Sequence, residues 1–109
     1  LPNSFAIKYP FIEYPNYVQD HRQTQNAKDR LMELVLETPG GVPCEQSPDL
    51  FFPEDQPDSI MQRMAEKIAK ELCKTCPVVE QCRNYGIMAA EPYGIYGGLT
   101  PEDRGRLIA

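Results

Sequence analysis

The four cysteines are the residues of this sequence best suited to do chemistry: Cys44, Cys73, Cys76 and Cys82. In order along the chain they are separated by 28, two and five residues. Thiolates bind zinc ions and the iron of iron–sulfur clusters, and pairs of thiols form or exchange disulfides. The set therefore predicts a metal centre, a pair of disulfides or a thiol redox site.

Two of these three chemistries fit the rest of the sequence poorly. Stable disulfides belong to oxidising compartments, and the start of the chain has no basic segment followed by an apolar one, as a secretory signal would. A thiol-disulfide reductase would use the C-x-x-C of Cys73 and Cys76 on a βαβ scaffold, and the sequence shows no convincing strand. A metal centre is the favoured interpretation.

The spacing bears differently on zinc and on an iron–sulfur cluster. A four-cysteine zinc site usually carries two C-x-x-C pairs, whereas here five residues separate Cys76 from Cys82 and Cys44 stands alone. A cluster tolerates uneven spacing because its ligands surround a group larger than a single ion. From the residues alone, a zinc-stapled protein-interaction module and a cluster-bearing protein both stay open.

Two amphipathic helices are predicted before the paired cysteines. The first runs from Thr24 to Glu37, is ended by Pro39-Gly40-Gly41, and gathers on one face Ala27, Leu31, Leu34 and Val35. A proline-rich stretch over residues 44–57 is predicted to be mostly loop. The second helix begins at Asp58 or Ser59 and places Cys73 in its last turn. Its apolar residues repeat every four positions: Ile60, Met64, Ile68 and Leu72, beside Met61, Ala65 and Ala69.

Two more helices follow the paired cysteines. Pro77 suits the first position of a third helix, which we expect to run to about Ala90 and to carry Cys82. After a turn-rich segment over residues 92–98, Thr100-Pro101 has the cap and first-turn proline of a short last helix. The fold class predicted is all-α, a small bundle of about four helices organised around the cysteine site.

The composition of the whole chain limits its partners. The 109 residues carry a formal charge of −5 and contain no apolar run of the roughly 18 residues that a membrane span needs. We expect a cytoplasmic protein with no membrane contact, in which residues 1–22 form an extended N-terminal arm and residues 23–109 form the domain. Non-specific affinity for nucleic acid comes from clustered Lys and Arg, so DNA contact is expected to be secondary at most.

The sequence gives little support to an enzyme. Its only histidine, His21, lies in a polar run that is expected to be solvated surface. With no second histidine, no Ser-His-Asp arrangement is expected, and the carboxylates of the 44–57 loop have no recognisable partner. The glycines at 94, 97 and 98 are too irregularly spaced to form a phosphate cradle and suit a tight turn instead. We expect a binding protein rather than a catalyst.

Three motifs in this order resemble the WhiB-like proteins of actinobacteria and their phages. They are the Cys44 segment continuing through Asp49-Leu50-Phe51-Phe52-Pro53, the Cys73-to-Cys82 segment with Pro77, and Gly94-Ile95-Tyr96-Gly97-Gly98-Leu99-Thr100. The resemblance covers Cys44 to about Ala109. It departs from the family at Tyr96, where the family has tryptophan, and at the end of the chain, which stops without the basic tail that contacts DNA in many members.

The resemblance implies a function as well as a fold. It implies that Cys44, Cys73, Cys76 and Cys82 bind a 4Fe–4S cluster that is sensitive to redox conditions or nitric oxide. It also implies a transcription regulator that binds the C-terminal region of the principal sigma factor of RNA polymerase. The residues expected to contact sigma are Phe51, Phe52, Gly94, Ile95, Tyr96, Gly97 and Gly98. Because Phe51 and Phe52 are adjacent in an extended loop, we expect them to point in opposite directions and at least one ring to be exposed.

Overall fold

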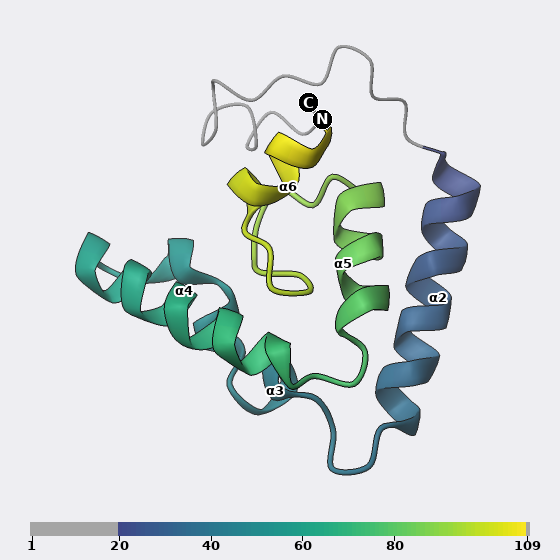
Figure 1. The fold of residues 1–109 in the computed structure, drawn as a ribbon, viewed down its shortest axis with the longest axis horizontal. Coiled ribbons are helices and arrows are strands. Elements are labelled where there is room, and N and C mark those ends of the chain that lie inside the picture. Colours follow the sequence, from purple (N-terminus) through teal and green to yellow (C-terminus); the bar gives the residue numbers. More distant parts are fainter. Residues whose placement is uncertain (1–19, 109) are drawn as a thin grey trace.

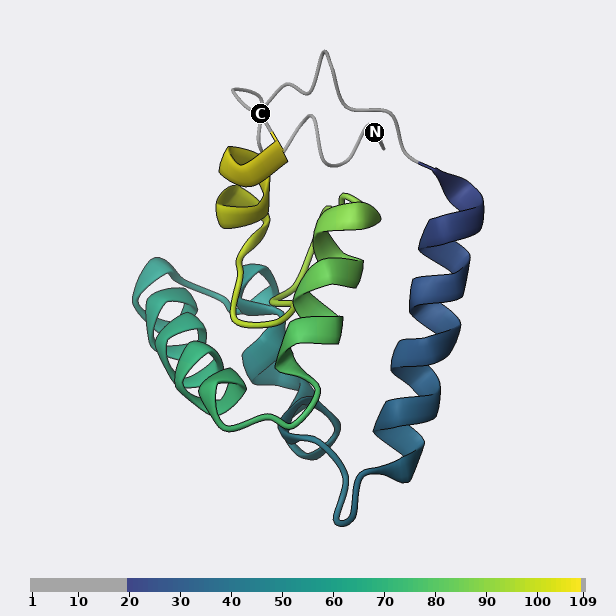
Figure 2. The same cartoon turned by 45° about the vertical axis from the view of Figure 1, so that its right-hand side comes forward.

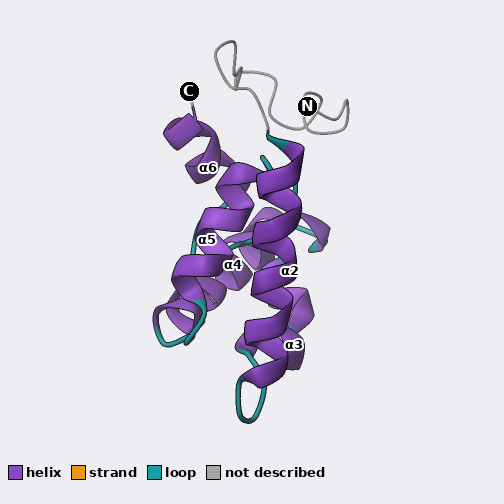
Figure 3. Cartoon of the chain, turned by 90° about the vertical axis from the view of Figure 1, so that its right-hand side faces the viewer, coloured by secondary structure: helices purple, strands orange, loops and turns teal. Residues whose placement is uncertain are grey.

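The computed structural model describes residues 20–108, so most of the predicted arm over residues 1–22 lies outside the described residues. The helices are α2 (His21–Glu37), the single-turn α3 (Pro43–Gln46), α4 (Ser59–Lys74), α5 (Val79–Met88) and α6 (Pro101–Ile108). Two 3-10 turns, η1 (Pro48–Phe51) and η2 (Pro53–Asp55), link α3 to α4. Within residues 20–108 the only β pairing is the isolated bridge of Tyr96 with Leu99, and Figure 3 shows helices and loops alone. Over these described residues, the prediction of an all-α fold is confirmed.

The long helices lie around a central turn. Figures 1 and 2 show α2 and α5 side by side, α4 running across one side of the molecule, and α6 at one end next to the loop that follows α5. The loop between α5 and α6 doubles back between α4 and α5 as a tight turn (Figure 1). None of the helices in this part of the chain has both the length and the apolar character needed to cross a membrane.

Side-chain caps explain where the helices begin. The Asp20 carboxylate accepts a hydrogen bond from the Gln23 N–H at the start of α2, and Asp58 accepts one from the Met61 N–H at the start of α4. Thr100 and Asp103 cap α6 reciprocally, each side chain accepting from the other residue's backbone N–H at 3.1 Å. The helix predicted from Thr24 begins three residues earlier, at His21, because Asp20 supplies the cap.

The prolines of the 44–57 segment start turns rather than preventing them. Pro43, Pro48 and Pro53 each occupy a first-turn position of α3, η1 or η2, where a missing N–H costs nothing. The segment was predicted to be mostly loop with one short turn around Asp49-Leu50. It is three short helical turns in succession: η1 is the predicted turn, and α3 and η2 were not predicted. These turns pack against α4.

The third predicted helix overshoots at both ends. The Cys76–Val79 stretch forms a separate turn closed by the Val79 N–H to the Cys76 carbonyl at 3.3 Å, so α5 starts at Val79 instead of Pro77. At the other end Ala90 has a φ of 48°, which ends α5 at Met88 instead of Ala90.

The buried face of α4 differs from the face that its large apolar residues mark. Ala65, Ala69 and Cys73 are buried, while four large apolar side chains of the same helix stay exposed: Ile60, Met61, Met64 and Ile68. Phe51 of η1 packs on Ala69 and Cys73 together with Ile95. The small residues of α4 thus let η1 and the turn after α5 approach the helix that carries Cys73.

Candidate metal centre

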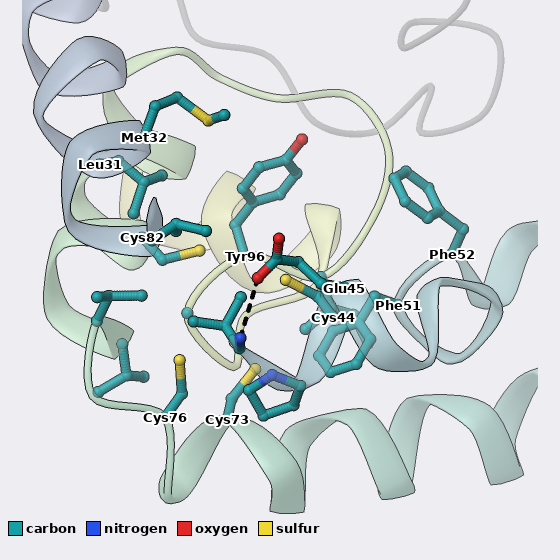
Figure 4. A pocket seen from close by; sticks show the side chains of 17 residues that line it. Leu31, Met32, Cys44, Glu45, Phe51, Phe52, Cys73, Cys76, Cys82 and Tyr96 are labelled. Atoms are coloured by element: carbon teal, nitrogen blue, oxygen red, sulfur yellow. Dashed lines mark hydrogen bonds between the residues drawn. The ribbon is translucent and has the colours of Figure 1, made fainter. Parts of the chain in front are cut away.

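All four cysteines line one cavity of about 300 Å³. Cys44 lies in α3, Cys73 in the last turn of α4, Cys76 in the connection that follows, and Cys82 in the first turn of α5. Figure 4 shows the four sulfur atoms directed into the same space from these different elements. The structure therefore brings together a set of thiols that the sequence spreads over almost 40 positions.

The rest of the cavity wall is almost wholly apolar. Leu31 and Val35 of α2, Val78 and Val79 before and in α5, and Ile95 of the turn supply most of it. At the open side lie Met32, whose exposure is 51%, and Phe52, whose exposure is 38%. Such a wall excludes water from whatever the thiols bind and lowers the local dielectric.

This environment disfavours isolated thiolates. Burial raises the pKa of Cys44, and the charge of Cys76 raises it further. Burial likewise raises the pKa of Cys73, and raises that of Cys82 to about 12. The turn acts in the opposite direction: hydrogen bonding from the Gly98 backbone lowers the pKa of Cys73, and hydrogen bonding from the Gly97 backbone lowers that of Cys82. Four thiolates in this cavity require positive charge bound among them, because a buried anion is costly unless it is compensated.

The arrangement fits a bound metal centre. All four cysteines are free thiols. Each iron of an iron–sulfur cluster takes one thiolate, and four thiols that line one cavity suit such a group. The donor set and the cavity therefore fit an iron–sulfur cluster held by Cys44, Cys73, Cys76 and Cys82.

The turn over residues 94–98 is fastened to the segment that follows Cys44. The Ile95 N–H donates to the Phe51 carbonyl at 2.8 Å, and the Gly94 N–H donates to the Glu54 carboxylate at 2.6 Å. On its other side, Arg83 of α5 donates from Nε to the Gly97 carbonyl at 2.9 Å. These bonds join two loops that are 40 residues apart and set both of them at the cavity.

The residues predicted to contact a partner occupy different depths. Phe51 and Ile95 are buried, with 4% and 5% exposure, and Gly94 and Gly97 are buried as well. Tyr96 and Gly98 are partly exposed, and Phe52 is the exposed ring of the phenylalanine pair. Burial raises the pKa of Tyr96 to about 12, so its hydroxyl stays neutral at the edge of the cavity. The surface that these seven residues offer to a partner is thus concentrated at Phe52 and Tyr96.

Sequence reasoning did not predict that three polar side chains hold the turn in place: Glu54, Arg83 and Arg104. Arg104 is 1% exposed and donates to three backbone carbonyls around the turn. A signal for it exists in the sequence. Pro101, Arg104 and Gly105, the buried residues of α6, follow the spacing of one helical face, with Arg106 on the exposed side.

Comparison with known proteins places most of this architecture in one family. Residues 41–107 match the family model described as "Transcription factor WhiB". This match runs from just before α3 to the end of α6, so it includes all four cysteines and the turn. It leaves out α2, whose Leu31, Met32 and Val35 complete the cavity wall.

Several regulators are similar to the chain over this part. The redox-responsive transcriptional regulator WhiB3 of Mycolicibacterium smegmatis is 41% identical over 59 residues, which are 54% of this chain and 62% of the relative. The redox- and pH-responsive transcriptional regulator WhiB3 of Mycobacterium tuberculosis is 39% identical over 54% of this chain and 58% of its own length. Transcriptional regulator WhiD of Streptomyces coelicolor is 37% identical over 54% and 53%. The matched region spans between half and two-thirds of each of these relatives.

Proposed function

The chain belongs to the WhiB family of transcription factors, and we propose that it is an iron–sulfur regulator of transcription that binds the C-terminal region of the principal sigma factor. In this proposal Cys44, Cys73, Cys76 and Cys82 hold a 4Fe–4S cluster. The observation that carries the proposal is that the four cysteines line one apolar cavity.

The cluster, when bound, supplies iron that exchanges electrons and reacts with oxygen or nitric oxide. The residues of this chain control how that chemistry is exposed. Leu31 and Val35 of α2 close one side of the cavity against water, and Phe51 closes another between α4 and the turn. Met32 and Phe52 border the open side, where a small reactant enters. The names of the WhiB3 relatives include a redox response, which supports a regulatory role for the same site here.

The partner surface and the cysteines share one wall. Phe51 contacts Cys73, and Tyr96 and Gly97 line the cavity beside Cys82. Loss of thiolate ligation would therefore repack the elements that carry Phe52 and Tyr96. A sigma-binding surface built in this way would respond to damage at the metal centre without a separate sensor domain.

An apolar contact suits the charge of the protein. With a net charge of −5 the chain has little clustered positive charge for a phosphate backbone. The exposed side chains of Phe52 and Met32, which lie on opposite sides of the cavity (Figure 4), offer apolar contacts to a partner. The main partner in this proposal is therefore a protein, and any contact with DNA is secondary.

One experiment tests both parts of the proposal. The protein is purified without oxygen together with the C-terminal region of the sigma factor, and iron, sulfide and zinc are measured in the co-purified complex. We expect about four irons and four sulfides per chain, as a 4Fe–4S cluster requires, and sigma retained on the column. Zinc without iron or sulfide would show a zinc-stapled module instead of a cluster-bearing protein. A cluster-loaded protein that does not retain sigma would show that sigma is not the partner.

A further inference from the structure

A buried guanidinium holds the loop between α5 and α6 in place. Arg104 of α6 is among the two largest fully buried side chains of the described residues, with 1% exposure. Its Nη1 donates to the Leu99 carbonyl at 2.7 Å, and its Nη2 donates to the carbonyls of Glu91 at 2.7 Å and Tyr93 at 3.2 Å. Two of these carbonyls precede the turn and one follows it. Arg104 therefore connects the segment that leads into residues 94–98 with the segment that leads out of them.

The same side chain also fixes the centre of the turn. The guanidinium carbon of Arg104 lies 5.2 Å from the centre of the Tyr96 ring, within the range of a cation–π contact. Gly86 of α5 permits this packing: a Cβ there would stand 2.6 Å from the Tyr96 Cβ and 3.3 Å from the Arg104 Cδ. The turn is thus held against α5 on one side and by Arg104 on the other.

The glycines at the tip of the turn, Gly97 and Gly98, lie next to the cysteines. Gly97 lines the cavity beside Cys82, and a Cβ on Gly98 would lie 3.6 Å from the Cys73 Cβ. These contacts place the backbone of the two glycines next to the two cysteines. Both glycines have positive φ, 59° and 79°, as the two central residues of the tight turn that the Leu99 N–H closes on the Tyr96 carbonyl at 3.1 Å.

Resting on the proposed cluster, we infer that Arg104 is a positioning residue for the metal centre: by fixing the turn, it aims the Gly97 and Gly98 N–H groups at the sulfurs of Cys82 and Cys73. Arg104 acts through the turn and touches neither sulfur. The residues that the resemblance assigned to partner contact thus have a second task, as hydrogen-bond donors to two of the four ligands.

The expected consequence is a higher reduction potential. Adding an electron to a thiolate-ligated cluster increases the negative charge on its sulfurs, and N–H donors stabilise that charge more in the reduced state than in the oxidised state. Removing the donors therefore shifts the potential to more negative values. An arginine fork reaches three carbonyls at once, whereas a lysine offers one compact ammonium group, so Lys at this position keeps the charge and loses the geometry.

The test compares variants of neighbouring arginines on α6. Cluster-loaded parent, Arg104→Met, Arg104→Lys and the control Arg106→Met are prepared without oxygen, and their iron content and midpoint potential are measured without sigma. Arg106 is a matched control because it lies on the same helix with 67% of its side chain exposed. We expect both Arg104 variants to have a more negative midpoint potential than the parent and Arg106→Met to keep the parental value.

Hydrogen–deuterium exchange gives a second readout on the turn itself. Amides of the peptide covering residues 94–99 should be protected in the parent and in Arg106→Met, and should exchange at least about tenfold faster in Arg104→Lys, as for amides released by local opening. If Arg104→Met fails to fold, Arg104→Lys and the exchange of the parent decide the question. Parental potentials in the loaded Arg104 variants, or unprotected turn amides in the loaded parent, would overturn the inference. A parent without iron would instead overturn the proposed function.

Discussion

The two sides of the turn over residues 94–98 are built on opposite principles. On the side of α6, the turn is bonded to the rest of the chain: the Arg104 guanidinium reaches three carbonyls, and Tyr96 rests on it. On the cavity side, the chain presents four cysteines and apolar side chains, and hydrogen bonding from the Gly97 and Gly98 backbone lowers the pKa of Cys82 and Cys73.

This difference separates what the chain holds by itself from what it holds for a bound group. Burial raises the pKa of three of the four thiols, so the cavity side gains stability when positive charge binds there. The α6 side satisfies a buried cation with carbonyl dipoles and a ring face. The first side should respond to loss of the metal centre, and the second should respond to ordinary packing and charge mutations.

Removing a cysteine should have the largest effect. We expect Cys44→Ala, Cys73→Ala, Cys76→Ala and Cys82→Ala each to lose the bound iron and much of the cooperative unfolding, because metal binding contributes folding free energy in a domain this small. Iron content and thermal unfolding by circular dichroism measure both. The control Val35→Ala removes an apolar wall residue without removing a donor and should keep its iron. An unchanged unfolding temperature after cluster removal would contradict the prediction.

A side chain on Gly97 should have the next largest effect, since it would both clash with the backbone of α5 and strain the turn. A Cβ there would stand 2.4 Å from the Arg83 backbone nitrogen, and the residue has a φ of 59°. Gly97→Ala is expected to lower the free energy of unfolding by about 2 to 4 kcal/mol, from overpacking and backbone strain together.

Gly40 provides the matched control for that substitution. It has a similar φ of 79° but nothing within 4 Å of a Cβ. Gly40→Ala should cost only the strain, about 1 kcal/mol. Denaturant titration of both variants compares the two values, and equal losses would show that the contact with α5 is unimportant.

Truncation of Phe52 tests the open side of the cavity as a partner surface. Phe52→Ala should weaken sigma binding by about 1 to 3 kcal/mol, the range for an aromatic residue near the centre of an interface, and leave the absorption of the cluster unchanged. Ile60→Ala is the control, because Ile60 is 61% exposed on α4 and does not line the cavity. Binding is measured by titration calorimetry without oxygen. Equal losses in both variants, or none in Phe52→Ala, would move the interface elsewhere.

A charge substitution on α6 should have the smallest of these effects. Burial alone would raise the pKa of Asp103, but the Thr100 N–H, Lys70 and Arg106 outweigh it and lower that pKa to about 2, from an ordinary value of 3.8. The ionised carboxylate therefore contributes stability that is present above pH 4 and lost as the pH falls from about 4 to 2. Asp103→Asn should remove about 1 to 2 kcal/mol at neutral pH.

The pH dependence of the unfolding free energy distinguishes the contribution of the ionised Asp103 carboxylate from a general effect of the substitution on α6. The difference in unfolding free energy between parent and Asp103→Asn should shrink between pH 4 and pH 2. Glu102→Gln is the control: Glu102 is 60% exposed and lies 3.7 Å from Arg106, so its loss should change little at any pH. A difference that stays constant down to pH 2 would mean that the ionised Asp103 is not the source.

Most of the fold could be predicted from local chemistry. The α4 helix was predicted from the Asp58 cap and the repeat of apolar residues, and α6 from Thr100 and Pro101, because caps and first-turn prolines act within one helical turn. The buried face of α4 could not be predicted in the same way. The periodicity predicts one broad apolar face that includes both Ile60 and Ala69. Only the packing of η1 against α4 decides that the small residues of this face are buried and the large ones exposed.

The sequence by itself determined which atoms this protein offers and where its helices begin: four thiols, their spacing, and the caps around them. Those properties depend on residue type and on neighbours a few positions away. Only the tertiary structure decided that the four sulfurs line one cavity, that Phe51 is buried while Phe52 is exposed, and that Arg104 reaches the turn. The cavity joins residues far apart in the chain, and all three properties depend on how closely α4, α5 and α6 pack, which no local pattern specifies.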